Sequence, residues 1–415
     1  MTADILVSTP DLRPSLLSIL QGLAEHKLLG NVATTIAVPR SLSRAVEHLP
    51  WAGSRLAPLL RRREVPGFLD GMVDAIWAGE LLRNLSSRFA GEILADAIYL
   101  WAVDRFDRSV ARRYAGRYPY IYGMDFSSAA TFAAQKLQGG HCIQRQVSAH
   151  FSSFIAMLRR ECERFPQFAN DYYRLILNRA EAHERRRAVE HGLADLIVAN
   201  SDYVLSTFVA NGVPAAKVVA VPTGCPPLDA KGARSGLGTE PVRFVYAGRL
   251  SLRKGFHYLM HAWQIADFGS HAELWVAGGA ELELPYDFAT QGNVRLYGVL
   301  NSDALVDVYR ASDIMVLPTL SEGLSHAVLE ALSFGMPVIT TAASGAGTLV
   351  TNENGIIVPE GDAEALASAM IRVVAERSKL PEMGKLSAEH ARVWTVANSN
   401  EAHVRIITEF LKARR

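Results

Sequence analysis

Short hydrophobic runs alternate with segments of helical periodicity along the second half of the chain. The runs are residues 243–247, 273–277, 294–297, 314–317, 337–341 and 355–358. Between and after them, hydrophobic positions recur at helical spacing over residues 255–265, 303–311, 325–334 and 363–375. Hydrophobic strands that alternate with helices are typical of a parallel, doubly wound α/β sheet. The second half is therefore predicted to fold as one such unit.

The first half shows the same alternation less regularly. Strand-like runs lie at residues 5–7, 120–124, 142–147, 196–199 and 218–221. Helical patterns cover residues 16–28, 129–137, 154–191 and 203–211, and the segment 42–118 is mostly helical in pattern. A second doubly wound unit is the natural interpretation.

A stretch rich in proline, glycine and alanine separates the two halves. Residues 222–240 lack hydrophobic periodicity, which is typical of a linker. We predict an N-terminal domain over residues 1–225, a linker over 226–240 and a C-terminal domain over 241–394, followed by a last helix at about 395–415. Ligands of such sheets bind beyond the carboxyl ends of the strands, so a site is expected in a cleft between the two units.

The charge balance of the chain argues against a nucleic-acid partner. The 415 residues carry 43 basic and 42 acidic side chains. Residues 1–225 hold 26 basic and 21 acidic side chains, whereas residues 226–415 hold 17 and 21. A basic first half fits an anionic membrane surface or a phosphorylated acceptor, or else solvated helix faces. Four hydrophobic residues, Trp51, Leu56, Leu59 and Leu60, precede the three arginines Arg61–Arg63. This pattern fits either peripheral binding to a membrane or amphipathic helices that face the core.

The cysteines and the lack of long hydrophobic runs suggest where the protein resides. Cys142, Cys162 and Cys225 have neither zinc-site nor redox-pair spacing, which predicts free thiols in a reducing cytoplasm. No signal-peptide pattern opens the sequence, and no hydrophobic run reaches the length of about 18 residues that a bilayer-spanning helix needs. We expect a cytoplasmic protein, with peripheral contact to the inner face of the membrane as an open alternative.

Two cations follow a hydrophobic strand in the segment from Ala247 to Lys254. Gly248 permits a close approach of the backbone to a ligand. Arg249 and Lys254 then lie within one loop, where arginine grips a diphosphate with its planar fork and lysine adds a point charge. An exposed basic loop without a ligand is the alternative.

Two glutamates flank the start of a predicted helix further along the chain. Glu322 lies in the loop before the helix, whose first backbone N–H groups, near Leu324–His326, are free to bind a phosphate. Its carboxylate can accept hydrogen bonds from sugar hydroxyls or simply complement the helix dipole. Glu330, inside the hydrophobic helix, suits the two hydroxyls of a ribose if it is buried, or pairs with His326 at the surface.

The order and spacing of these segments resemble the family-four retaining glycosyltransferases, also called glycosyl transferases group 1. The segment from Glu322 to Ile339 has that family's two glutamates separated by seven residues, followed by its Gly-x-Pro turn at residues 335–337. The Ala-Gly-Arg-Leu sequence and the later Lys-Gly pair, within residues 247–255, resemble the family's diphosphate loop. The resemblance covers residues 240–375.

The resemblance implies a GT-B fold, in which two Rossmann-like, doubly wound parallel-sheet domains face a central cleft. It implies that Arg249 and Lys254 hold the donor diphosphate, that Glu322 contacts the transferred sugar and that Glu330 binds the ribose. The remaining donor-binding residues implied are Gly248, Gly298, Val299, Gly323, Leu324 and Ser325. The last helix is expected to cross back onto the N-terminal domain. The family is generally metal-independent and the chain has no Asp-x-Asp motif, so we expect no metal and no cofactor.

The N-terminal half resembles the family less closely. Ser8–Asp11 stand where members often carry a glycine-rich loop. His150 matches the family's cleft histidine and is expected to be catalytic by stabilising the sugar through a hydrogen bond, although a helix-capping or core histidine is the alternative. Arg145, Ser148 and Glu161 are expected to line the acceptor side.

These residues and the resemblance predict a retaining, metal-independent glycosyltransferase. It would move a sugar from a nucleoside-diphosphate sugar to a hydroxyl of a glycan or lipid-linked acceptor, in surface polysaccharide or lipopolysaccharide biosynthesis. A GT-B-type nucleotide-sugar epimerase and a non-catalytic nucleotide-sugar-binding protein remain alternatives. A nicotinamide-dependent dehydrogenase is disfavoured, because no Gly-x-Gly-x-x-Gly sequence follows residues 5–7 or 243–247.

Overall fold

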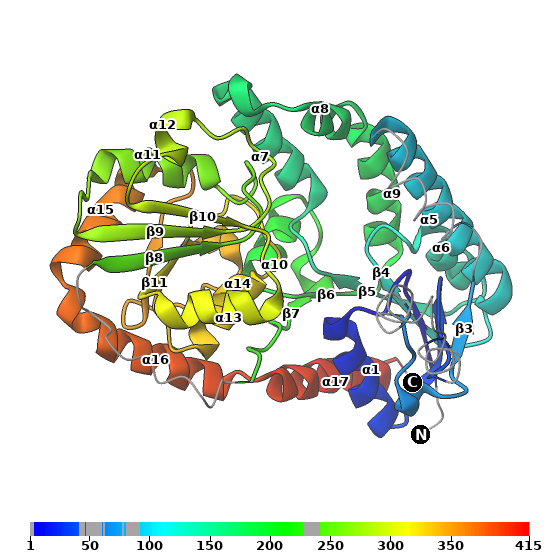
Figure 1. Ribbon diagram of the computed structural model, residues 1–415. Helices are drawn as coiled ribbons and strands as arrows, with labels where there is room; N and C mark the ends of the chain where they lie inside the picture. The colour runs from blue at the N-terminus through cyan, green and yellow to red at the C-terminus, as the bar shows by residue number, and fades with distance from the viewer. Residues whose placement is uncertain are drawn as a thin grey trace.

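Two parallel β-sheets, each flanked by helices, form the protein (Figure 1). The computed structural model describes residues 4–40, 63–76, 92–227 and 241–414, together with residues 46, 60 and 79. The hydrophobic segment Trp51–Leu59 and most of the predicted linker therefore lie outside the described residues. The predicted domain boundaries stay predictions. None of the helices in the described ranges is both long enough and apolar enough to cross a membrane.

The first sheet has seven parallel strands in the order β3-β2-β1-β4-β5-β6-β7. Strands β1 and β6 are uniformly buried because their side chains are almost all aliphatic and both faces are covered by helices. The strands are β1 (Ile5–Ser8), β2 (Leu29–Thr34), β3 (Val73–Ala75), β4 (Tyr120–Met124), β5 (His141–Gln146), β6 (Leu196–Ala199) and β7 (Val218–Ala220). The helices of this half are α1 (Pro14–Glu25), α5 (Glu92–Tyr114), α6 (Ala129–Leu137), α7 (Phe151–Arg164), α8 (Asp171–Asn178), α9 (Ala180–Leu193) and α10 (Asp202–Ala210), of which α7 and α8 pack into the core of the second sheet.

The predictions for the first half were wrong in three places. Strand β2 was not predicted, since Gly30 and Asn31 interrupt its hydrophobic pattern. Strand β3 lies inside the segment 42–118 that was predicted to be mostly helical. The long helical segment predicted over residues 154–191 is divided into three helices; Pro166 begins a short 3₁₀ turn after the first, and the Asn170 side chain caps α8.

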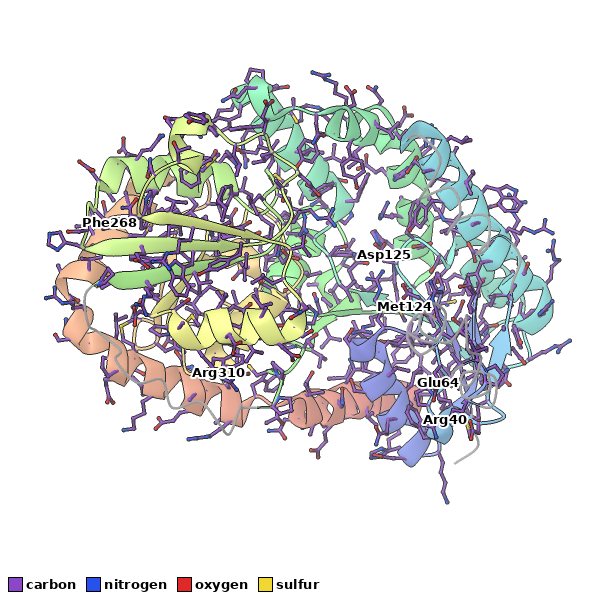
Figure 2. The ribbon with its side chains drawn as sticks, viewed as in Figure 1. Arg40, Glu64, Met124, Asp125, Phe268 and Arg310 are labelled. Carbon is purple, nitrogen blue, oxygen red and sulfur yellow. The ribbon has the colours of Figure 1, made fainter. Side chains whose placement is uncertain are left out.

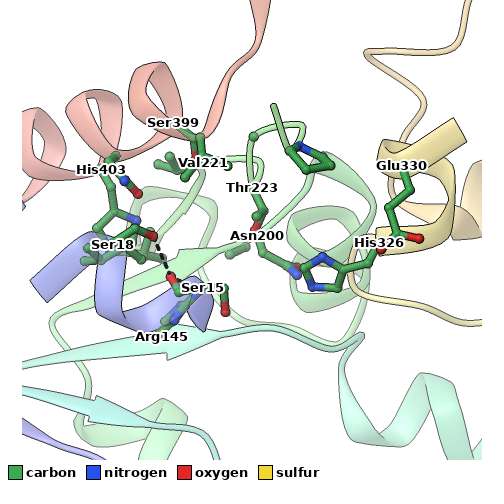
Figure 3. Close-up of a pocket in the computed structure, with 17 residues that line it drawn as sticks. Ser15, Ser18, Arg145, Asn200, Val221, Thr223, His326, Glu330, Ser399 and His403 are labelled. Atoms are coloured by element: carbon green, nitrogen blue, oxygen red, sulfur yellow. Dashed lines mark hydrogen bonds between the residues drawn. The ribbon is translucent and has the colours of Figure 1, made fainter. Parts of the chain in front are cut away.

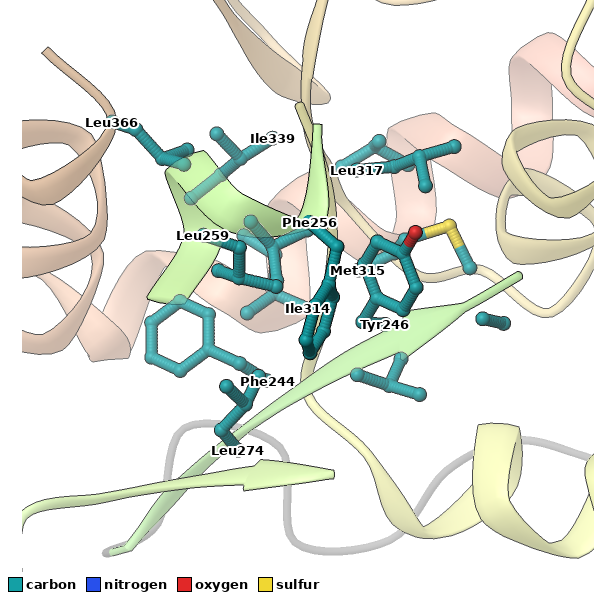
Figure 4. Packing of buried hydrophobic residues seen from close by; sticks show 14 of the residues in the cluster. Phe244, Tyr246, Phe256, Leu259, Leu274, Ile314, Met315, Leu317, Ile339 and Leu366 are labelled. Atoms are coloured by element: carbon teal, nitrogen blue, oxygen red, sulfur yellow. The ribbon is translucent and has the colours of Figure 1, made fainter. Parts of the chain in front are cut away.

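The second sheet has six parallel strands in the order β10-β9-β8-β11-β12-β13. These are β8 (Val242–Ala247), β9 (Ala272–Ala277), β10 (Val294–Gly298), β11 (Ile314–Leu317), β12 (Val338–Thr341) and β13 (Gly355–Val358), as predicted within a residue or two. The helices are α11 (Phe256–Ala266), α12 (Tyr286–Ala289), α13 (Ser302–Ala311), α14 (His326–Ser333), α15 (Ala363–Ala375) and α16 (Leu380–Val393). Helix α16 was not predicted. Phe244 and Tyr246 of β8 pack with Phe256 and Leu259 of α11 in the largest core (Figure 4).

The last helix, α17 (Val396–Lys412), packs against α1 of the first sheet (Figure 1). Val404, Ile407 and Leu411 share one core with Leu16 and Leu20. The crossing is held at its start, where the Cys225 N–H donates to the Trp394 carbonyl at 2.8 Å and the Trp394 indole N–H donates to the Pro222 carbonyl at 3.2 Å. Residues at the two ends of the chain thus build one unit.

The ends of the central strands of the first sheet face the second sheet. Figure 2 shows Met124 and Asp125, at the end of β4, on the side of the first sheet that faces the second, whereas Phe268 lies at the far edge of the second sheet. The edges at which both sets of strands end are therefore where a ligand of the two sheets would lie.

Candidate functional site

The four central predicted donor residues line one cavity at the carboxyl ends of β8 and β9. The cavity measures about 640 Å³, and Arg249, Lys254, Glu322 and Glu330 all contribute to its wall. Glycines 248, 278 and 279, in the loops after the two strands, also line the cavity. The four side chains come from the loop after β8, from the segment after β11 and from helix α14. They meet because the carboxyl ends of parallel strands lie on one edge of the sheet.

Lys254 is oriented by the turn that starts α11. Gly255 has a φ of +68°, and a Cβ atom there would lie 1.8 Å from the Pro318 carbonyl oxygen. A side chain at this position is therefore excluded, and the loop lies directly on the segment that follows β11. The Lys254 side chain is only 12% exposed and points toward Glu322, which lies in the segment that follows β11.

Lys254, Arg253 and Glu322 form a compact charged cluster. The Lys254 ammonium and the Arg253 guanidinium both pair with Oε2 of Glu322, the latter at 3.0 Å. Burial lowers the pKa of Lys254, and the Glu322 carboxylate acts against that shift. Burial also acts to raise the pKa of Glu322, but the two cations outweigh it and hold that pKa below its usual value. Two cations thus share one anion, which leaves this wall of the cavity positive. Arg253 was not singled out from the sequence.

Arg249 has a different carboxylate partner, Glu281, that was also not singled out. Its Nη1 lies 2.5 Å from Oε1 of Glu281, and the arginine side chain is 64% exposed. The other Glu281 oxygen accepts a hydrogen bond from the Tyr173 hydroxyl of α8 at 2.9 Å. The hydrogen bond from Arg249 to Glu281 raises the pKa of the guanidinium, so it is fully charged. An anion entering the cavity would compete with Glu281 for Arg249.

Glu330 faces the cavity from α14 while it is held by a neighbouring helix. Its Oε2 accepts a hydrogen bond at 2.9 Å from the Tyr309 hydroxyl of α13. This partner, rather than His326, keeps the half-buried carboxylate in place. Its second oxygen has no hydrogen bond among the described residues, which is compatible with the predicted ribose contact.

The loop that leads into α14 lies between the two sheets. The Ser201 hydroxyl donates to the Gly323 carbonyl at 2.5 Å, and a Cβ atom at residue 323 would lie 1.7 Å from the Val147 carbonyl oxygen. Leu324 is buried, and the Oγ of Ser325, at the N-cap of α14, is buried without a hydrogen-bond partner. The phosphate-binding role predicted for these backbone N–H groups stays a prediction.

Gly298 and Val299, predicted to meet the nucleotide base, follow β10. The Gly298 carbonyl accepts a hydrogen bond from the Gly278 N–H at 2.7 Å. Val299 is 81% exposed and lines the same cavity as Arg249. An exposed aliphatic side chain at the mouth of a cavity is suited to contact the flat ring of a nucleotide base.

A second cavity, of about 430 Å³, lies between the two sheets. Its walls include Thr9, Asp11 and Arg13 after β1, so the loop that replaces the expected glycine-rich sequence does face the site. Glu322 contributes to the wall of this cavity as well as to the first one. A smaller cavity of about 260 Å³ continues beside α1 and α17, and Arg145 lines both of these (Figure 3).

His150 and Ser148 lie near these cavities without lining any of the three among the described residues. His150 is the N-cap of α7: its Nδ1 accepts from the Ser152 N–H at 3.3 Å, and its ring packs against Phe208. Burial lowers its pKa, so the ring is neutral. Ser148 is exposed and accepts a hydrogen bond from Gln146 at 3.2 Å. The catalytic and acceptor roles of both residues stay predictions.

Glu161 lies elsewhere, between α7 and the second sheet. Its carboxylate is 1% exposed and accepts hydrogen bonds from His257 Nε2 at 3.2 Å and from the Tyr258 hydroxyl at 2.8 Å. Burial acts to raise the pKa of Glu161, but these bonds and one from Arg160 outweigh it and lower that pKa. The residue joins α7 to α11 and lines none of the three cavities described above, and its place on the acceptor side stays a prediction.

Two parallel α/β sheets that meet across cavities with cations at their strand ends constitute the GT-B fold of glycosyltransferases. HepE of Anabaena, solved in complex with UDP, superposes with a TM-score of 0.60 at 15% identity, covering 98% of this chain and 100% of that chain. A further structure of HepE, in complex with UDP-glucose, superposes with a TM-score of 0.58 at 16% identity, covering 98% and 99%. At such identities the likeness concerns the fold.

Residues 241–376 match the family described as glycosyl transferases group 1. The capsular polysaccharide biosynthesis glycosyltransferase CapM of Staphylococcus aureus is 32% identical over 146 residues, which are 34% of this chain and 38% of CapM. The lipopolysaccharide core biosynthesis glycosyltransferase LpsE of Rhizobium meliloti is 34% identical over 146 residues, which are 33% of this chain and 42% of LpsE. Alignments to the curated relatives span 37% to 53% of the relatives' length.

Proposed function

We propose that the protein transfers a sugar from a nucleoside-diphosphate sugar to a hydroxyl of a glycan or lipid-linked acceptor, in surface polysaccharide or lipopolysaccharide biosynthesis. The observation that carries this proposal is the single cavity lined by Arg249, Lys254, Glu322 and Glu330. HepE, of the same fold, binds UDP and UDP-glucose, which favours a uridine nucleotide in this cavity. The names of CapM and LpsE favour a polysaccharide as the product.

In the proposed reaction the bond between the anomeric carbon and the diphosphate oxygen breaks, and its electron pair leaves with the diphosphate. The acceptor oxygen attacks from the face that the diphosphate leaves, and its proton passes to the leaving phosphate, so the anomeric configuration is retained. Arg249, Arg253 and Lys254 neutralise the charge on the leaving group. Preorganised groups of this kind contribute about 2.7–4 kcal/mol each to lowering the barrier.

The two glutamates bind the donor rather than react with it. Donor binding draws Lys254 and Arg253 toward the diphosphate, which frees Glu322 to accept hydrogen bonds from the hydroxyls of the transferred sugar. Glu330 uses the oxygen not engaged by Tyr309 for the ribose. Because these side-chain cations neutralise the leaving group, we propose that transfer proceeds without a divalent metal.

The proposal is tested by incubating the purified protein with UDP-sugars and glycan or lipid-linked acceptors in EDTA. Transfer should be lost by a factor of about 100–1,000 in Lys254→Ala, and UDP binding should weaken. The matched control is Lys385→Ala, a lysine of α16 whose side chain is 65% exposed. Wild-type turnover in Lys254→Ala would remove the cation from the mechanism. An inverted anomer in the product would refute retention, and an isomerised donor formed without acceptor would indicate an epimerase.

A further inference from the structure

A buried arginine without a carboxylate partner lies at the end of β5, between the two sheets. Three arginines line the 430 Å³ cavity. Arg13 pairs with Asp11 at 3.1 Å and Arg187 with Asp125 at 3.4 Å. Arg145 is only 6% exposed and forms no ion pair with any described residue; its one hydrogen bond goes from Nη2 to the Ser15 carbonyl at 3.3 Å.

An arginine in this state is costly to the folded protein. A buried charge needs a paired anion and several hydrogen bonds to offset its lost hydration. Arg145 has five N–H donors and uses one, so most of its planar fork remains open toward the cavities. Burial lowers the pKa of the guanidinium and Arg13 acts in the same direction, while the Tyr122 hydroxyl acts against them.

The surroundings of Arg145 favour an anion. Helix α1 begins at Pro14 and has no side-chain cap, and the Leu16 and Leu17 N–H groups both bond to the Arg13 carbonyl. The Ser15 N–H at this helix start therefore has no place in the helical hydrogen-bond pattern, and the positive end of the helix dipole lies beside Arg145. Asn200 and Thr223 add polar side chains to the same walls (Figure 3).

No acidic residue among the described residues that line these cavities is paired with Arg145. Asp11 and Asp125 pair with other arginines and Glu322 pairs with Lys254. Glu330, which keeps one oxygen free beside its bond from Tyr309, forms no ion pair with Arg145. A ligand that enters these cavities would bring the missing negative charge.

We propose that Arg145 binds an anionic group, a phosphate or a carboxylate, of a substrate that lies between the two sheets. The cavity it lines is the one that Glu322 shares with the nucleotide cavity, so the group lies within reach of the reacting sugar. The assignment to a substrate rests on the proposed function. The group belongs either to the acceptor or to the donor, and these two sources are distinguished by whether the nucleotide cavity must be empty for it to bind.

The test uses inorganic phosphate as the probe and thermal unfolding as the readout, on the full chain with and without saturating UDP. Millimolar phosphate should raise the melting temperature of the wild type, because a ligand that binds only the folded state stabilises it. Arg145→Gln should lose this response, and Arg145→Lys, which keeps the charge without the fork, should keep part of it. Arg405→Gln, an exposed arginine of α17, is the matched control and should respond like the wild type.

UDP then identifies the source of the anion. A phosphate response that persists in UDP-saturated wild type and is absent from Arg145→Gln assigns the site to an anionic acceptor. A wild-type response that UDP abolishes, with UDP binding about tenfold weaker in Arg145→Gln, assigns it to the donor. Equal responses to phosphate and equal UDP affinity in wild type and Arg145→Gln overturn the proposal.

Two further measurements separate ligand binding by Arg145 from a purely structural role, and the Arg145 site from the proposed function. Without ligand, Arg145→Gln should melt no lower than the wild type, since it removes an uncompensated buried charge. A large drop in its melting temperature, together with an unchanged phosphate response in Arg145→Lys, would indicate a purely structural arginine. That result overturns the proposal. If the wild type binds no UDP-sugar, the proposed function is wrong but the Arg145 site is still tested. The phosphate response of wild type and Arg145→Gln measures that site without a UDP-sugar.

Discussion

Glu161→Ala removes the carboxylate that joins α7 to the second sheet, and its effect on stability can be worked out from the contacts. The carboxylate accepts one hydrogen bond from His257 and one from Tyr258. Because Glu161 is ionised and can only accept, Nε2 of His257 must carry the proton. Both partners are buried, at 0% and 2% exposure, so neither can turn to water when the carboxylate is removed.

The expected loss is about 2–6 kcal/mol of unfolding free energy, since each of the two buried polar groups left without a partner costs about 1–3 kcal/mol. The third partner, Arg160, is 61% exposed and adds little, because water replaces the contact. Arg164 still donates to the Tyr258 oxygen at 3.2 Å, which keeps the ring in place but leaves its O–H without an acceptor.

Urea unfolding followed by tryptophan fluorescence measures this loss, since Trp263 is buried on the same helix as His257 and Tyr258. Glu163→Ala, an exposed glutamate on the same helix as Glu161, is the matched control and should lie within about 0.5 kcal/mol of the wild type. Glu161→Gln keeps an acceptor and should lie between the two. A loss in Glu161→Ala below about 1 kcal/mol, the typical net worth of one hydrogen bond, would refute the assigned role.

The pH dependence of the same variants provides a second check. Folding lowers the pKa of Glu161, so its contribution is present above the unfolded-state pKa of about 4.3 and is lost as the pH falls through the lower folded-state value. Burial also lowers the pKa of His257, which adds a loss of stability below about pH 6.5, where the unfolded state binds the proton first. The Glu161 carboxylate acts against the lowering of the His257 pKa, so the difference between wild type and Glu161→Gln should first grow below about pH 6.5 and then shrink below about pH 4.3, where Glu161 is protonated in the unfolded state. A difference that keeps growing below about pH 4.3 would contradict the assignment.

Two predictions concern the walls of the cavities. Glu281→Gln frees Arg249 from an exposed ion pair worth about 0.2–1 kcal/mol, so UDP should bind about 1.4- to 5-fold more tightly by calorimetry; weaker binding would mean that Glu281 itself contacts the nucleotide. Gly323→Ala forces a Cβ against the Val147 carbonyl and should lower the unfolding free energy by about 1–3 kcal/mol, whereas Gly347→Ala, with open space around it, should be neutral in the same urea experiment. Equal effects of the two alanines would show that the loop before α14 is not confined.

Much of the second sheet and its cavity could be predicted because the relevant signals are local. Hydrophobic strands of four to six residues separated by helices define β8–β13 without reference to distant residues. In a parallel sheet all carboxyl ends lie on one edge, so residues that follow different strands, such as Arg249 and Glu322, must come together. Arg249, Lys254, Glu322 and Glu330 were therefore predicted to share one site, and in the structure all four line the same cavity.

The first half was predicted less well because its local signals are weaker. Gly30 and Asn31 hide β2, and the valine and alanine of β3 flank an aspartate in a three-residue strand. Pairing with neighbouring strands stabilises these segments, and that pairing is a property of the sheet and not of the segment. Helix α16 lacked a clear pattern for a related reason, since it packs mainly against α14 across a narrow face.

The partners of the site residues depend on tertiary structure alone. The sequence by itself determined which side chains carry charge at the strand ends, because residue type and strand periodicity are local properties. Only the packing of segments 21 to 97 residues apart decided that Glu281 holds Arg249, that Tyr309 holds Glu330 and that Glu161 joins α7 to α11. The same holds for the burial of Arg145 without a carboxylate. Side-chain pairing over such separations follows from the path of the whole chain, which no local pattern encodes.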